Sequence, residues 1–187
     1  GASAGARPGR AGAGLALARG AVALAPAPRW REAVRTLAWH VTPAWGVRLI
    51  KNICKAENID IKQLAPKYIL SIIDRWKNKG FYPNEVIINK NDIYEKTLLP
   101  LYKIYQQKLL DLNACDFGDL ILHAVKILEK NLDNREIYSN NFKYILVDEY
   151  QDTNYIQSRW LYLLSEKHKN LCCVGDDDQS IYSWRGA

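Results

Sequence analysis

The chain has 187 residues, 48% of them hydrophobic, which is enough to bury one sizeable core, or one core with a smaller helical lobe. Its formal net charge of +6 comes almost entirely from residues 1–46, which hold six arginines against the single acid Glu32. Residues 47–187 hold twenty basic and nineteen acidic residues. This balance excludes a general positive field over the globular part, so a nucleic-acid site must come from local placement of charges.

Cysteine usage and hydropathy indicate a soluble, cytoplasmic protein. The four cysteines form no C-x-x-C pair and no His-spaced metal pattern, and we interpret them as reduced core thiols; they are Cys54, Cys115, Cys172 and Cys173. No apolar stretch reaches the length that a membrane-spanning helix requires. We therefore expect no membrane partner.

The composition changes sharply near residue 46. Residues 1–46 are dominated by Ala, Gly, Arg and Pro and contain no Lys, Asn or Ile, whereas the remainder is rich in those three. We interpret residues 1–46 as a disordered or foreign leader, with one marginal helix over 30–45. The early arginines and the apolar run 15–27 also resemble a transit or signal peptide, which is the alternative.

Three helices are predicted between residues 47 and 112. One runs over 47–56, and a better one begins at Pro66 and stops at Gly80, with an apolar face listed as Ile69, Ile72, Ile73 and Trp76. A long pattern from Asp92 has Leu98, Leu101, Tyr102, Tyr105, Leu109 and Leu112 on one side. Pro100 should kink or split this third helix.

A helix, a strand, a second helix and a second strand are predicted in the last third of the chain. Asp116 can cap a helix whose core face comprises Phe117, Leu120, Ile121, Ala124, Val125 and Leu128. The run 144–147 is typical of a buried strand, 154–167 returns to helical spacing, and 171–174 is a second short apolar run. Strand, helix and strand over this length indicate a parallel βαβ unit.

Acidic residues follow the first of these strands directly. Asp148 and Glu149 stand at its carboxyl end, the edge at which open parallel sheets bind ligands. An acid there can hold Mg²⁺, which bridges the phosphate oxygens of a nucleotide, and its neighbour can activate a water molecule. The alternative is a solvated strand end, with Asp152 capping the next helix. The polar stretch 175–187 at the end of the second strand favours the functional interpretation, because two polar loops then emerge on one edge.

These two stretches carry a family resemblance. The sequence LVDEYQDTNYIQ over 146–157, followed by VGDDDQSIYSWRGA over 174–187, resembles motifs II and III of superfamily 1 DNA helicases of the UvrD/Rep type. Residues 102–120 resemble the segment that precedes motif II, and residues 48–94 resemble the helical insertion called 1B. The resemblance covers about three quarters of the chain, from Val47 to the end.

The resemblance implies a role for six residues. Asp148 would coordinate Mg²⁺, Glu149 would be the general base for ATP hydrolysis, and Gln179 would sense the γ-phosphate. Tyr182, Trp184 and Arg185 match positions that contact single-stranded DNA, with Trp184 as a stacking surface for a base. The alternative for the two aromatic residues is that they cover core. The acids 176–178 are interpreted as a solvated turn.

The expected fold class is α/β, as part of a RecA-like P-loop NTPase core with a mostly helical insertion. We assign residues 47–115 to the 1B-like helical subdomain and 116–187 to the partial RecA-like domain with motifs II and III. The sequence contains no Gly-Lys dipeptide, so the phosphate-binding loop G-x-x-x-x-G-K-[ST] is absent. The chain is therefore expected to be a helicase fragment that uses ATP, Mg²⁺ and single-stranded DNA as part of a larger motor, with little ATPase activity alone.

Two other functional classes remain open. A non-enzymatic single-stranded DNA-binding module would use the helical lobe and the Trp184 loop without nucleotide. A two-metal nuclease would use the acids Asp148, Glu149, Asp152 and Asp176. Nuclease chemistry gives no reason for the sequence Gln-Ser-Ile-Tyr-Ser-Trp-Arg over 179–185.

Overall fold

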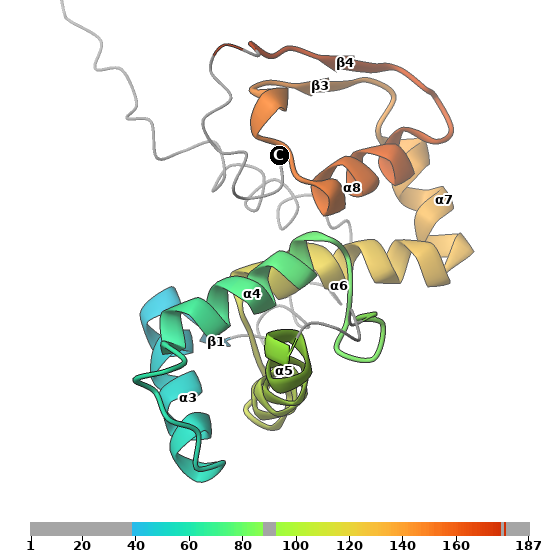
Figure 1. Ribbon diagram of the computed structural model, residues 1–187. Helices are drawn as coiled ribbons and strands as arrows, with labels where there is room; N and C mark the ends of the chain where they lie inside the picture. The colour runs from blue at the N-terminus through green and yellow to red at the C-terminus, as the bar shows by residue number, and fades with distance from the viewer. Residues whose placement is uncertain (1–38, 88–92, 177, 179–187) are drawn as a thin grey trace, which may run out of the picture. The chain divides into compact units, whose positions relative to one another are not determined.

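The computed structural model describes residues 39–87, 93–176 and Asp178 of the chain (Figure 1). The described part is mostly helical and contains two small parallel sheets. Its elements in chain order are β1 (Trp39–His40), α3 (Pro43–Ala56), α4 (Pro66–Asn78), α5 (Ile93–Asp111), β2 (Ala114–Cys115), α6 (Phe117–Lys130), α7 (Leu132–Asn141), β3 (Ile145–Val147), the 3-10 helix η1 (Tyr150–Asp152), α8 (Tyr155–Ser165) and β4 (Leu171–Cys173). No helix within the described ranges is long and apolar enough to cross a membrane.

The fold begins before the boundary expected at residue 46. β1 pairs in parallel with β2, and the backbone N–H of Val41 donates to the carbonyl of Cys115 at 3.1 Å. Thr42 then caps α3, which starts at Pro43 rather than Val47, because proline suits a first helical turn. Residues 39–46 therefore do not belong to a disordered leader. The pairing partner of β1 lies more than seventy residues away, so composition could not reveal it. Residues 1–38 of the expected leader lie outside the described residues.

The middle helices agree with the predicted patterns in most respects. α4 spans Pro66–Asn78, and Gly80 follows it with φ of +82°, donating its N–H to the carbonyl of Lys77. α5 is one continuous helix, so Pro100 does not split it. Pro100 lacks the N–H that would bond to the carbonyl of Lys96, and both residues are exposed. The predicted apolar face is buried except for Leu112, which lies beyond the helix end.

α6 has the predicted cap, and its buried face agrees with the prediction in part: Val125 and Leu128 are buried, and Ile121 packs against the same core. Asp116 accepts a hydrogen bond from the N–H of Asp119, and Asp119 accepts one from the N–H of Asp116, which forms a capping box. Phe117 and Leu120, which we expected in the core, are exposed. The face that is buried consists of Asp119, Leu122, Val125 and Leu128. The helix takes this rotation because Asp119 pairs with a buried lysine of α4.

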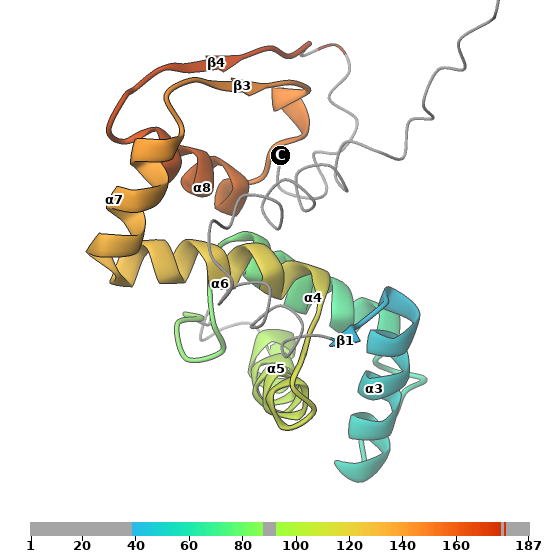
Figure 2. The ribbon, with the colours of Figure 1, turned by 180° about the vertical axis from the view of Figure 1, so that it is seen from behind.

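That lysine is Lys77, and it joins α4, α5 and α6. The side chain of Lys77 is wholly buried, with its Nζ 2.6 Å from Asp116 Oδ2 and 2.8 Å from Asp119 Oδ1. Tyr105 and Gln106 of α5 donate hydrogen bonds to the same two carboxylates. Burial and the Asp116 carboxylate raise the pKa of Tyr105, so its hydroxyl stays protonated and donates. α4 and α6 consequently lie side by side, as the front and rear views show (Figure 1, Figure 2).

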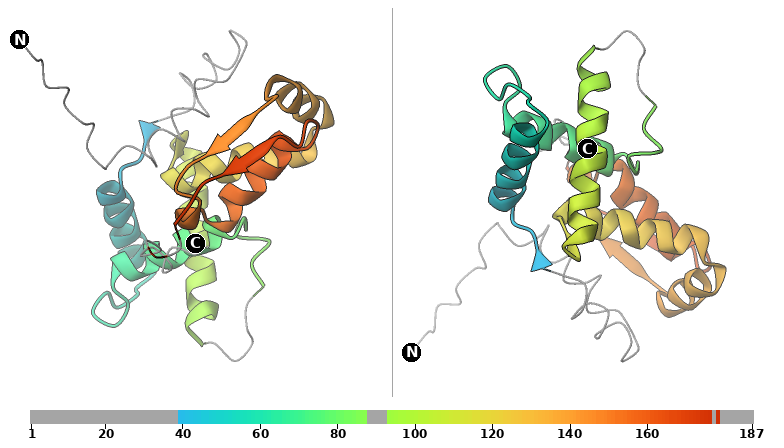
Figure 3. Two further views of the ribbon diagram at one scale, coloured as in Figure 1. Left: turned by 90° about the horizontal axis from the view of Figure 1, so that it is seen from above. Right: turned by 90° about the horizontal axis from the view of Figure 1, so that it is seen from below.

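The last third of the chain forms the predicted parallel βαβ unit. β3 pairs with β4 in the register Ile145↔Leu171, Leu146↔Cys172 and Val147↔Cys173, and α8 connects the two strands. The two strands lie side by side over α8 when seen from above (Figure 3). The expectation of buried strands is only partly correct. Val147 is buried and Ile145 packs on the core of α6 and α8, but Leu146 is 74% exposed and β4 is exposed along its length, because those helices cover one face only.

We predict that Lys77→Met destabilises the protein strongly. The substitution keeps most of the apolar stem but leaves Asp116 and Asp119 buried without their cation, which costs about 3–5 kcal/mol when one partner of a buried pair is removed. The free energy of unfolding should be measured by urea titration of the purified chain. Lys67→Met is the matched control, since Lys67 is an exposed lysine of the same helix. Equal effects of the two substitutions would contradict the central role of the buried lysine.

We also predict a pH dependence that arises at His123. The Tyr82 hydroxyl lies 2.6 Å from His123 Nδ1, an arrangement in which the neutral ring accepts the hydrogen bond. Burial lowers the pKa of His123, against the attraction of Asp119, whose carboxylate is 4.0 Å from Nε2. The unfolded chain takes up this proton near pH 6.5 while the folded chain resists it, so stability should fall as the pH drops below about 6.5.

Urea unfolding of the wild type and His123→Asn between about pH 7.5 and pH 5 isolates this contribution. As the pH falls, the unfolding free energy of the wild type should decrease more than that of His123→Asn. Asparagine is suitable because its side-chain oxygen stands close to the position of Nδ1. Parallel pH profiles would refute the assignment to His123.

Candidate nucleotide site

The two polar loops predicted to share one edge of the sheet are adjacent. β3 ends at Val147 and β4 ends at Cys173, and backbone pairing continues past both strand ends. The N–H of Val174 donates to the carbonyl of Val147 at 2.8 Å, and the N–H of Tyr150 donates to the carbonyl of Val174 at 3.0 Å. The loop that carries Asp148 and Glu149 is thereby held against the loop that begins at Gly175.

The two acids at the end of β3 are exposed and held by local backbone geometry. Asp148 Oδ1 accepts a hydrogen bond from the N–H of Glu149 at 3.0 Å. Glu149 adopts the left-handed conformation, with φ of 56° and ψ of 42°, which is uncommon for a residue other than glycine or asparagine. The chain then turns into η1, and the N–H of Asp152 donates to the carbonyl of Glu149. Lys169, in the turn before β4, has a similar φ of 53°, so this conformation by itself does not mark a functional residue.

Gln151 links the two loops, although the sequence pattern alone gave it no role. Its Nε2 donates to Glu149 Oε2 at 2.6 Å, and its Oε1 accepts from the N–H of Asp176 at 3.0 Å. Gly175 allows this approach, because a Cβ at that position would lie 2.7 Å from Gln151 Oε1. The signal for Gln151 was its place inside the motif II stretch, between the acidic pair Asp148–Glu149 and the single acid Asp152.

Asp152 does not cap the helix that follows. Asn154 is the N-cap of α8, in a capping box with Gln157. Asp152 Oδ1 is buried and has no hydrogen-bond partner within the described part of the chain. An acceptor without a partner is rare in a folded interior, so this oxygen is suited to a donor from a ligand or another segment.

The carboxylates at this edge of the sheet have the chemistry that a magnesium nucleotide uses. Among the described residues, no group of three or more His, Cys, Asp or Glu is placed to hold a metal ion by itself. Mg²⁺ in nucleotide sites instead takes one or two carboxylates and fills its other positions with water and phosphate oxygens. The carboxylate of Asp148 is exposed at the strand end, where it could serve as such a ligand.

The structure describes part of motif III. Asp176 and Asp178 are exposed, and Asp176 Oδ1 accepts from the N–H of Asp178, in agreement with a solvated turn. The predicted phosphate sensor Gln179 lies outside the described residues. The same holds for the predicted DNA-contacting residues Tyr182, Trp184 and Arg185.

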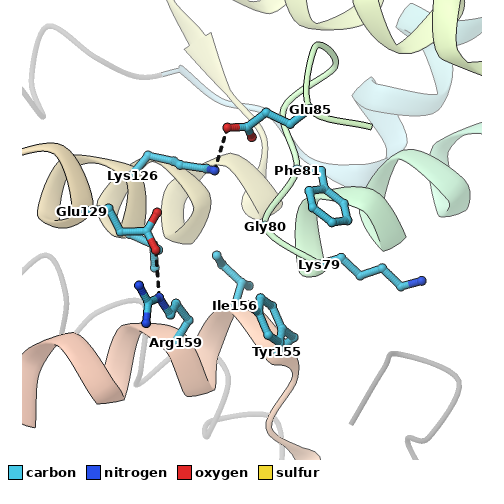
Figure 4. A pocket seen from close by; sticks show the side chains of 10 residues that line it. Lys79, Gly80, Phe81, Glu85, Lys126, Glu129, Tyr155, Ile156 and Arg159 are labelled. Atoms are coloured by element: carbon cyan, nitrogen blue, oxygen red, sulfur yellow. Dashed lines mark hydrogen bonds and ion pairs between the residues drawn. The ribbon is translucent and has the colours of Figure 1, made fainter. Parts of the chain in front are cut away.

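One cavity among the described residues lies away from the acids. It has a volume of about 240 Å³ and is lined by the segment after α4, by α6 and by the start of α8 (Figure 4). Ion pairs between Lys126 and Glu85 and between Arg159 and Glu129 form part of its walls. None of the predicted site residues lines it.

Comparison with known proteins identifies the family. Residues 28–187 match the UvrD/REP helicase N-terminal domain. The chain is 44% identical over 142 residues to a probable DNA helicase II homolog of Rickettsia conorii, covering 75% of this chain and 22% of that protein. It is 44% identical over 139 residues to the ATP-dependent DNA helicase PcrA of Staphylococcus epidermidis, covering 74% of this chain and 19% of that protein.

The chain spans about a fifth of the length of these relatives. The family match includes the helices α3 to α6, the βαβ unit and both polar loops. The family match agrees with the position of the acids at the carboxyl edge of a parallel sheet. The chain belongs to the UvrD/REP helicase family, of which it contains a region of the N-terminal domain.

Proposed function

We propose that this chain supplies the metal-binding and water-activating acids of an ATP-driven DNA helicase. The observation that carries the proposal is the position of Asp148 and Glu149 at the end of β3, hydrogen-bonded through Gln151 to the loop after β4. PcrA of Staphylococcus epidermidis, a relative, is described as an ATP-dependent DNA helicase. Residues 116–187 would then form part of a RecA-like nucleotide-binding domain, and the helices before Asp116 its helical insertion.

Each acid has a separate role in this proposal. Asp148 would bind Mg²⁺, and the cation would offset the charge that develops on the phosphate oxygens of ATP. Glu149 would accept a proton from the attacking water, which requires its carboxylate to be held in place. Gln179 would contact the γ-phosphate. Positioning contributes most of the rate in phosphoryl transfer, so contacts that fix Glu149 matter as much as its charge.

The DNA contacts would follow directly along the chain. Tyr182, Trp184 and Arg185 lie within ten residues of Asp176, whose backbone is bound to Gln151. Stacking of a base on an aromatic ring tolerates any sequence, and a translocating motor needs that tolerance. A short loop with the phosphate sensor at one end and the base platform at the other would link hydrolysis to DNA movement.

We predict that Glu149→Gln abolishes ATP hydrolysis in a complete motor. Residues 116–187 of this chain should replace the corresponding segment of full-length PcrA from Staphylococcus epidermidis, and DNA-stimulated ATPase activity should be measured. Loss of the general base should lower kcat by about 10²–10⁴-fold while ATP binding is retained. An active chimera that is unaffected by Glu149→Gln would refute the proposed role.

Two controls define this experiment. Glu136→Gln removes an exposed carboxylate from α7 and should leave kcat unchanged. The 187-residue chain by itself should hydrolyse ATP no faster than its own Glu149→Gln variant, because its sequence contains no phosphate-binding loop.

We further predict that Trp184→Ala weakens binding of single-stranded DNA. Loss of one stacking partner costs about 1–3 kcal/mol, so Kd for a labelled oligothymidine should rise about 5- to 150-fold in fluorescence anisotropy. Tyr144→Ala is the control, since Tyr144 is an aromatic residue that is 82% exposed on a different segment. Equal affinities of the wild type and Trp184→Ala would contradict the assignment. If DNA binding does not depend on ATP and Mg²⁺ and the chimera is inactive, the result would favour the non-enzymatic DNA-binding module.

A further inference from the structure

The cavity beside the end of α4 has the features of a protein-interaction site. We propose that it binds a peptide segment of a partner protein, in which an aromatic residue stands next to an acidic one. The cavity is separate from the candidate nucleotide site, because none of the residues proposed to bind nucleotide or DNA lines it. The inference therefore goes beyond the proposed function and can hold or fail independently of it.

Apolar and aromatic side chains form one part of the lining. Val125 of α6 and Ile156 of α8 are buried, and they line the cavity together with Phe81 and Tyr155. Phe81 is 37% exposed and Tyr155 is 62% exposed, so part of each side chain is accessible to a partner. Accessible aromatic residues beside an apolar cavity are typical of the positions that contribute most to binding between proteins.

The segment that carries Phe81 is held in place by contacts on both sides. Gly80 has φ of +82°, which residues with a side chain rarely adopt, and a Cβ there would lie 3.2 Å from Ile156 Cδ1 and 3.8 Å from Tyr155 Cε1. The hydroxyl of Tyr102 donates to the carbonyl of Phe81 at 3.0 Å. A lining that is fixed before a partner arrives reduces the entropy lost on binding.

Two ion pairs place charges of both signs in the walls. Lys126 Nζ lies 2.9 Å from Glu85 Oε1, and Arg159 Nε lies 2.8 Å from Glu129 Oε1 (Figure 4). The carboxylates of Glu85 and Glu129 would repel the phosphates of a nucleic acid. Paired charges instead offer donors and acceptors to the backbone and polar side chains of a peptide. The walls therefore favour a protein partner over a nucleic acid.

Lys79 supplies a charge that the described residues do not neutralise. It is the exposed C-cap residue of α4 and lines the cavity, and its ammonium has no carboxylate within 4.0 Å among the described residues. Figure 4 shows its side chain extending away from the two ion pairs. An acidic residue of the partner complements this charge, and such complementarity fixes the orientation of a bound peptide.

The volume of the cavity limits what can enter it. Sites that take a whole small molecule usually measure about 300–1,000 Å³. This cavity measures about 240 Å³, which suits one large side chain of a longer ligand better than a whole cofactor. An aromatic side chain can in addition pair with the rings of Phe81 and Tyr155. Volume and lining thus agree on a single aromatic side chain.

Peptide titrations of the 187-residue chain test the proposal. The probe is a fluorescein-labelled peptide of sequence Gly-Asp-Phe-Asp-Gly, and binding is measured by fluorescence anisotropy. Alanine in place of its phenylalanine should raise Kd about 30-fold, as expected for loss of a dominant interface residue. Tyr155→Ala in the protein should raise Kd about fivefold, whereas Tyr144→Ala, an exposed aromatic residue outside the cavity, should leave it unchanged. Absence of saturable binding, or equal Kd values for the phenylalanine and alanine peptides, would overturn the inference.

An exchange of charges tests the role of Lys79. Lys79→Glu should raise Kd for the aspartate peptide about two- to fivefold and lower Kd for the same peptide with lysine at both aspartate positions. Lys167→Glu is the matched control, because Lys167 is an exposed lysine that does not line the cavity. The acidic part of the proposed ligand is wrong if the two substitutions have the same effect on both peptides.

Two further measurements distinguish the other occupants. Displacement of the labelled peptide by unlabelled oligothymidine would make the cavity part of a DNA-binding surface and overturn the inference. The peptide should also bind full-length PcrA of Staphylococcus epidermidis in which residues 39–187 of this chain replace the corresponding segment. Binding to the chain but not to this chimera would mean that another part of the motor covers the cavity, which would again overturn the inference. An inactive chimera that binds the peptide would contradict the proposed function and support the docking site.

Discussion

The buried ammonium of Lys77 is the interaction on which the packing of this protein depends. A charge without contact to water is tolerated only when oppositely charged groups and hydrogen bonds surround it, and Asp116 and Asp119 provide them from α6. The requirement fixes the rotation of α6, which turns Phe117 and Leu120 outward and Asp119 inward. Helices α4, α5 and α6 thus meet at this electrostatic contact, while the apolar residues of α4 and α5 and those of α6 lie in two separate clusters.

The position of α6 in turn determines where the candidate site lies. α6 and α8 share one apolar cluster, and Ile145 of β3 packs against it. The strands therefore present one face to the helices, while Tyr144 and Leu146 are exposed. The acids lie outside this packing because they follow the strand ends. Backbone groups hold them there instead of a hydrophobic layer.

The candidate site combines strain and hydrogen bonding in a few residues. Glu149 has a left-handed backbone, and the carboxylate that it presents is bound by Gln151. The close approach of Gly175 brings a second loop into the same network. The hydrogen bond from Gln151 restricts the orientation of the Glu149 carboxylate, which is exposed at the edge of the sheet. Restriction of this kind reduces the reorganisation that a catalytic step requires.

The sequence by itself determined the local features of this protein, because they depend on neighbouring residues. The cap at Asp116, the stop at Gly80, the parallel βαβ unit and the acids after β3 all follow from short-range patterns. Only the tertiary structure decided which face of α6 is buried, that the fold includes β1 and the start of α3, and that Gln151 joins two loops. Each of these depends on partners far along the chain: Lys77 for α6, Cys115 for Val41, and Asp176 for Gln151. Periodicity and composition describe neighbours in sequence, whereas the pairing of charges and backbone groups across long separations is fixed only when the chain folds.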